Sequence, residues 1–128
     1  MPSLVALGFC AILFVPQSSR AADRKAIDEA VKMGVAYLSD QFQGMKPGDL
    51  REATGIGPAA LAGLALLESG KPANDPTVKA IAAAVRDAAY TETRTYQISL
   101  CVFFLDRLGE PTDAAYIQML AVRLLFSI

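Results

Sequence analysis

The chain has 128 residues, of which 53% are hydrophobic and 20% charged, and its formal net charge is −1. This length allows at most one domain, and so apolar a composition argues against intrinsic disorder. The scattered basic residues lack the electrostatic footprint of a nucleic-acid-binding protein. Histidine is absent, so no imidazole metal ligand exists and no side chain ordinarily titrates near neutral pH.

The first 21 residues differ from the rest. Residues 4–15, LVALGFCAILFV, form an unbroken apolar run that is followed by Pro16 and small polar residues. The run is too short to cross a bilayer as a helix, but it fits a secretory signal peptide cleaved after Ala21. We therefore expect a secreted or periplasmic protein without a stable transmembrane anchor, although the first three residues carry no Lys or Arg. A core helix or a membrane anchor is the alternative interpretation.

Cleavage after Ala21 would leave Cys101 as the sole cysteine, because the other is Cys10. Cys10 follows the bulky Phe9, which argues against a lipoprotein cysteine. A single cysteine cannot form an intramolecular disulfide. Cys101 lies in the apolar stretch ISLCVFFL, and apolar surroundings raise the pKa of a thiol. The sequence predicts a buried, inert thiol.

Apolar residues recur at helical spacing in five segments, and no segment has a convincing strand pattern, so the fold class predicted is all-α. The first helix is expected at 24–42, with Asp23 as its N-cap. Its apolar stripe comprises Ile27, Ala30, Val31, Gly34, Val35 and Leu38. Residues 43–58 are rich in Gly and Pro and are predicted to be a loop, in which Asp49 and Glu52 start at most one short turn.

Four further helices are expected at 58–69, 76–90, about 96–108 and 114–126. The helix at 58–69 is apolar nearly all round, which predicts burial on most faces. Asn74 or Asp75 is expected to cap the next helix, and Asp113 the last one.

Residues 57–85 align with residues 96–124 without a gap. The polar breaks coincide, since Gly70 falls on Gly109 and Pro72 on Pro111. The apolar stripes coincide as well, at Leu61 and Leu100, Leu64 and Phe103, Leu66 and Leu105, Val78 and Ile117, Ile81 and Leu120, and Val85 and Leu124. A period near 40 is typical of stacked helical hairpins that cannot bury their apolar faces alone. The alternation predicts two layers, with the more apolar helices inside.

Residues 24–126 resemble the α/α toroid of the squalene cyclases and protein prenyltransferases, most of all its compact secreted bacterial members. The matching residues are Gly34, Tyr37, Leu38 and Gln41 in the first helix, Ala65, Leu66, Leu67 and Gly70 in the second, and Phe104, Leu105 and Gly109 in the repeat. The resemblance implies that residues 22–128 are stacked hairpins forming part of a toroid.

The family's catalytic features are missing from this chain. The family's signature turn reads Gln, Asp-Gly, Trp, whereas residues 41–49 read QFQGMKPGD and the chain contains no Trp. The acidic D-x-D-D motif of the cyclases is absent, and the Asp, Cys and His zinc ligands of the prenyltransferases cannot be assembled without His. We therefore assign no catalytic, cofactor-binding or metal-binding residue and expect no cofactor.

Several residues are candidate site residues. Asp28 and Glu29 are adjacent and point apart, and Asp49 and Glu52 fall in or beside the predicted loop. Asp106 and Arg107 end an apolar helix, where a charge could enter a cavity, but a solvated helix end with Arg107 near its carbonyls is favoured. An aromatic pocket for a cation could comprise Tyr90, Tyr96, Phe103, Phe104 and Tyr116, but core packing is favoured. Residues 55–57, GIG, lack the further features of a phosphate loop.

Three functions remain open. The favoured one is a non-catalytic helical-repeat module for packing or protein contact. The second is the N-terminal part of a terpene-cyclase- or prenyltransferase-like enzyme whose catalytic residues lie beyond residue 128, since the chain ends within a helix at RLLFSI. The third is a self-associating secreted binding domain. So few hairpins should leave apolar faces uncovered on the end helices, which predicts self-association or a protein partner for residues 22–128.

Overall fold

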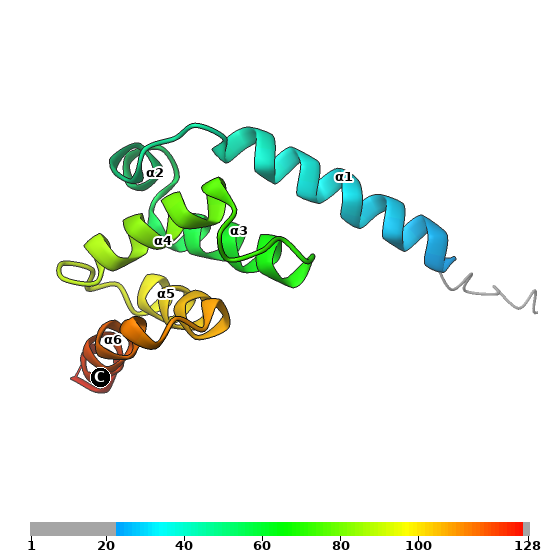
Figure 1. Ribbon diagram of the computed structural model, residues 1–128. Coiled ribbons are helices and arrows are strands. Elements are labelled where there is room, and N and C mark those ends of the chain that lie inside the picture. The colour runs from blue at the N-terminus through cyan, green and yellow to red at the C-terminus, as the bar shows by residue number, and fades with distance from the viewer. Residues whose placement is uncertain (1–22, 127–128) are drawn as a thin grey trace, which may run out of the picture.

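The computed structural model describes residues 23–126, which fold into α-helices and one short 3₁₀ helix without any strand (Figure 1). The helices are α1 (Arg24–Phe42), α2 (Pro47–Thr54), α3 (Ile56–Glu68), α4 (Pro76–Ala88), α5 (Thr95–Leu108) and α6 (Ala114–Phe126), with the 3₁₀ helix η1 (Pro111–Asp113) before α6. The prediction of an all-α protein is confirmed. The predicted signal peptide at residues 1–21 lies outside the described residues.

Helix α2 corrects the prediction of a loop over residues 43–58. Its eight residues bury Leu50 completely, and this apolar anchor stabilises a helix in a segment rich in Gly and Pro. The Lys46 amide donates to the Asp49 carboxylate over 3.3 Å, so Asp49 caps from inside the first turn rather than as the N-cap. Gly55, at φ +78°, separates α2 from α3, which starts at Ile56 rather than at Pro58.

Asp75 caps α4 as predicted, whereas the side chain of Asp113 does not cap α6. The Asp75 carboxylate accepts from the amides of Thr77 at 2.9 Å and Val78 at 3.3 Å, as expected of an N-cap. Asp113 lies inside η1 and is completely buried. Its carboxylate binds Arg86 on α4, and so it serves a tertiary contact rather than a helix end.

The helices form two rows. In one row, α3 packs against both α1 and α5; in the other, α2 packs against α4, and α6 lies beyond, next to α5 (Figure 1). The contact between α3 and α5 is the most extensive, so the two repeated apolar segments are helices that touch directly. Both rows contribute to the core, which includes Leu50, Ile56, Leu66, Val78, Ile81, Val85, Ile98, Cys101, Phe104, Leu105 and Leu120.

Helix α1 is loosely attached. Of its 19 residues only Phe42 is buried, and the predicted apolar stripe is largely exposed, with Ile27 at 49% and Val31 at 50%. Its N-terminal part extends beyond the other helices (Figure 1). Asp23 occupies the N-cap position of α1, as predicted, but its side chain makes no capping hydrogen bond. The first hairpin therefore leaves an apolar face uncovered.

Helix α6 shows the same feature at the other end of the array. It buries only Leu120, whereas Leu125 is 70% exposed and Phe126 is 84% exposed. Both terminal helices thus carry uncovered apolar faces, as expected for so short a stack of hairpins. Within residues 23–126, no helix combines the length and the apolarity that crossing a bilayer requires.

Candidate functional site

Asp106 and Arg107 lie at the exposed end of α5, as the favoured interpretation had it. Arg107, however, does not turn back to its own helix. Its Nε lies 2.5 Å from Glu68 Oε1 at the end of α3. The two residues are 39 positions apart, which is the offset of the repeat, so the same position in two hairpins forms an ion pair.

The other candidate acid–base carboxylates lie on the surface. Asp28 and Glu29 are exposed on α1, and Asp49 and Glu52 are exposed on α2. In the part of the chain that the structure describes, no group of three or more His, Cys, Asp or Glu side chains could hold a metal ion.

The five aromatic residues do not line one pocket. Phe104 is completely buried in the core, whereas Tyr96 and Phe103 are 68% and 62% exposed on α5. Tyr90 and Tyr116 pack edge to face, with their ring centroids 5.9 Å apart, and their interaction raises the pKa of Tyr90. The rings therefore lie in the core, on the exposed face of α5 and in the Tyr90–Tyr116 contact, so α5 has an exposed aromatic face.

Cys101 is completely buried. Desolvation raises the pKa of its thiol to about 12, and the negative charge of Glu92 acts in the same direction. The thiol is protonated at neutral pH and inaccessible, which agrees with the prediction of an inert cysteine.

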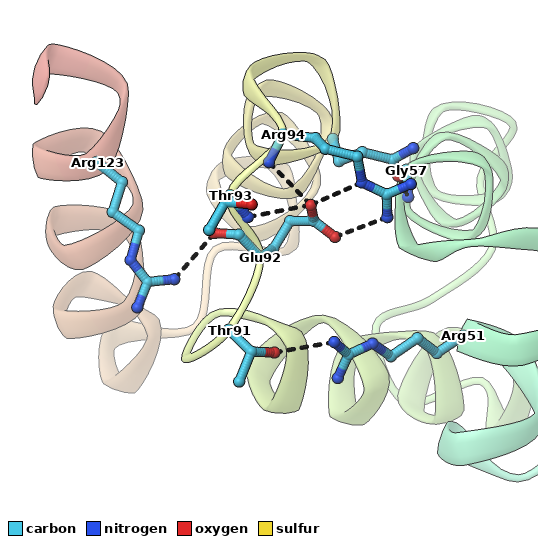
Figure 2. Close-up of polar contacts among 8 residues, drawn as sticks. Arg51, Gly57, Thr91, Glu92, Thr93, Arg94 and Arg123 are labelled. Carbon is cyan, nitrogen blue, oxygen red and sulfur yellow. Dashed lines mark hydrogen bonds and ion pairs between the residues drawn. The ribbon is translucent and has the colours of Figure 1, made fainter. Parts of the chain in front are cut away.

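The turn between α4 and α5 holds a polar network that the sequence analysis did not anticipate (Figure 2). Glu92 is only 5% exposed. Its carboxylate accepts from the amides of Thr93 at 3.1 Å and Arg94 at 2.9 Å, and from the Arg94 guanidinium at 2.9 and 3.0 Å. The hydrogen bonds from the Arg94 side chain are the main cause that lowers the pKa of Glu92 to about 2.

Two further arginines fix this turn from neighbouring helices. Arg123 on α6 donates to the carbonyl oxygens of Ala89 at 2.7 Å, Tyr90 at 2.6 Å and Glu92 at 3.0 Å. These carbonyls follow the end of α4 and would otherwise lack helical partners. From the other side, Arg51 on α2 donates to the Thr91 hydroxyl over 2.9 Å (Figure 2). The network therefore positions the turn.

A second unanticipated contact joins α4 to the turn before α6. Arg86 donates to both carboxylate oxygens of Asp113, over 2.6 and 2.8 Å, and to Glu110 over 3.0 Å. The hydrogen bond with Asp113 is the main cause that raises the pKa of Arg86. The sequence signal is weak, because an Arg and an Asp that are 27 residues apart follow neither helical spacing nor the repeat. Like the Glu92 network, this contact holds hairpins together.

Two adjoining hollows lie between α1 and α3, and we call them together the α1–α3 groove. One hollow, of about 420 Å³, is lined by Val31, Gly34, Val35, Leu38, Ala65, Glu68 and Ser69. An adjoining hollow, of about 360 Å³, is lined by Leu38, Phe42, Pro58, Leu61, Ala62 and Ala65. The lining is almost wholly apolar, so its chemistry suits the binding of an apolar surface. Neither hollow was anticipated, because the sequence does not show how loosely α1 would pack.

A more polar cleft, of about 390 Å³, lies where the turn after α1 meets the start of α4, and its lining includes Lys71, Asp75 and Thr77. The charged groups at this cleft already have partners. Lys71 Nζ lies 3.6 Å from Asp75 Oδ2, and the Asp75 carboxylate caps α4. The cleft therefore presents no free charge for a ligand.

No protein-family model matches the chain, and neither a curated protein nor a solved structure is significantly similar to it.

Proposed function

We propose that residues 22–128 form a non-catalytic helical-repeat module, part of a larger α/α toroid, which acts by protein contact through the apolar faces of α1 and α6. The observation that carries the proposal is the exposure of α1, a helix of 19 residues that buries only Phe42 and leaves Ile27 and Val31 of its apolar stripe about half exposed. Monomeric proteins rarely expose a contiguous apolar patch of this kind, and such patches usually mark a contact site.

The energetics favour a covering partner. Most of the stability of a helix in a protein comes from the packing of its apolar face. Each Å² of apolar surface removed from water contributes about 25 cal/mol. Covering the stripe of α1 would therefore stabilise a helix that gains little from its present contacts.

The perturbed charges of the described residues support a structural role. Glu92, Arg86 and Arg94 each have a shifted pKa, and each shift comes from an ion pair that fixes a turn. Perturbed groups that gather in a cleft are the usual sign of a catalytic site, whereas Glu92, Arg86 and Arg94 line none of the hollows described above. The alternative, an enzyme with its catalytic residues beyond residue 128, predicts that an extended reading frame encodes further repeats with Trp and an acidic cluster.

Photo-crosslinking in the cells that make the protein tests the proposal. A photoreactive residue in place of Val31 on α1 or Phe126 on α6 should give a protein adduct. The same residue in place of Lys79, which is exposed on α4, serves as the control and should give none. Adducts of equal yield at all three positions, or none at any, would refute a contact function for these faces.

A further inference from the structure

The 39-residue offset relates the faces of α3 and α5 as well as their sequences. Helix α5 packs on α3 with Gln97, Leu100 and Phe104. Gln97 accepts from the Gly57 amide, and a side chain added at Gly57 or Gly63 would meet Gln97, Leu100 or Phe104. The equivalent residues on α3 are Pro58, Leu61 and Ala65.

Those equivalent residues form the α3 side of the α1–α3 groove. On α5 this face is covered by α3, and Leu100 is 9% exposed; on α3 the equivalent Leu61 is 47% exposed. The groove is therefore the open counterpart of an interface that the chain already forms within itself.

The opposite face of α5 is equivalent in the repeat to the face of α3 that packs on α5. Helix α3 contacts α5 through Gly57, Gly63 and Glu68. The residues at the equivalent positions of α5 are Tyr96, Val102 and Arg107, and Phe103 lies on the same side of the helix. Tyr96 and Phe103 are 68% and 62% exposed. We call the side of α5 that carries Tyr96 and Phe103 the outer α5 face, and a further hairpin would cover it. Arg107 lies at its edge, where it pairs with Glu68 of α3.

Charge and size both fit this face to the groove. Glu68 and Arg107 occupy equivalent positions with opposite sign, and Glu68 lines the groove. Glu68 already pairs with Arg107 of its own chain, but its side chain remains 60% exposed, so moving the repeat on by one step would bring a second Arg107 beside the same carboxylate. The glycines of α3 allow a close approach to α5, whereas the groove is wide because α1 packs loosely. The aromatic side chains of the outer α5 face have the bulk to fill it.

We propose that a second copy of this chain docks its outer α5 face into the α1–α3 groove, extending the stack head to tail. This inference rests on the proposed function and names the partner as the chain itself. The two surfaces are different, so each copy offers one of each, and the contact is heterologous and open-ended.

The test uses the full chain in sedimentation-velocity experiments over a range of concentrations. The unmodified chain should form species larger than a dimer. Leu61→Asp, which blocks the groove, and Phe103→Asp, which blocks the outer α5 face, should each remain monomeric with unchanged helical circular dichroism. Met33→Asp is the matched control, because Met33 is 68% exposed on α1 and does not line the groove. It should associate like the unmodified chain.

Mixing the two blocked variants is the decisive measurement. Phe103→Asp retains an intact groove and Leu61→Asp retains an intact outer α5 face, so the mixture should form a dimer and stop there. A mixture that stays monomeric, an unmodified chain that is monomeric throughout, or blocked variants that associate as before would each overturn the proposal. A monomeric chain that still crosslinks another protein at Val31 would leave the proposed function standing; the absence of any adduct would end both.

Discussion

Gly63 is where the close packing of α3 on α5 can be tested with a single added carbon. A Cβ at this position would lie 2.5 Å from Phe104 Cε2 and 3.0 Å from Ile81 Cγ2. Both neighbours are completely buried, so neither can swing into solvent. Overpacking a core in this way costs about 1–3 kcal/mol, while replacing a mid-helix Gly by Ala returns about 1 kcal/mol. Gly63→Ala should therefore lose about 1 kcal/mol of unfolding free energy.

Gly34 provides the matched control, because it also lies inside a helix but has no atom within 4 Å of an added Cβ. Gly34→Ala should keep only the helix-propensity gain, at most about 1 kcal/mol. The assay is urea and thermal unfolding followed by circular dichroism at 222 nm. For a domain of this size, the expected loss in Gly63→Ala lowers the Tm by about 4–8 °C. A Gly63→Ala variant as stable as Gly34→Ala would refute the close approach of α3 to Phe104.

Three other predictions concern buried groups. Asp113→Ala should lower the free energy of unfolding by about 2–4 kcal/mol in urea titration, because it leaves the partly buried Arg86 with only the exposed Glu110 as its ionic partner. Asp87→Ala, which removes an exposed pair, should cost less than about 1 kcal/mol, and equal losses would contradict the burial of Asp113. Because the pKa of Glu92 is lowered to about 2, the ionised carboxylate stabilises the fold fully above its ordinary pKa, and this stabilisation should be lost as pH falls from about 4.5 towards 2. Glu92→Gln should therefore weaken the acid dependence of the unfolding free energy, and an unchanged dependence would count against the network. In a Cys10→Ser background, Cys101 should resist Ellman's reagent at pH 8 until urea unfolds the chain; rapid labelling of the native protein would show that the thiol is exposed.

The helices could be predicted where apolar periodicity and end signals agree. For α4, Asp75 before Pro76 fixes the start, and its cap is present as expected. The loop predicted for the α2 segment is wrong, because its Gly and Pro residues favour a loop while the burial of a single residue, Leu50, stabilises a helix. The burial of one side chain is a tertiary effect that a local sequence pattern does not show.

The repeat predicted more of the tertiary structure than any local motif did. It places α3 against α5 and accounts for the ion pair of Glu68 with Arg107. It does not predict the links made by Arg86 or Arg123, which depend on how the turns lie in space. The α1–α3 groove could not be predicted either, because the periodicity of α1 shows that its stripe is apolar but not how much of it is covered.

The break in the repeat accounts for the groove. Helix α3 starts at residue 56 and α5 at residue 95, which is 39 residues on, but α1 starts at residue 24, only 32 residues before α3. Helix α1 is therefore not a copy of α3, and it has no glycines placed like Gly57 and Gly63 to bring it close. The α3 face formed by Pro58, Leu61 and Ala65 is therefore packed only loosely, because its neighbour is α1 and not a helix of the repeat. The docking that we propose follows from that mismatch, because the same face of α5 is covered by α3 where the 39-residue register is kept, and Leu100 there is 9% exposed.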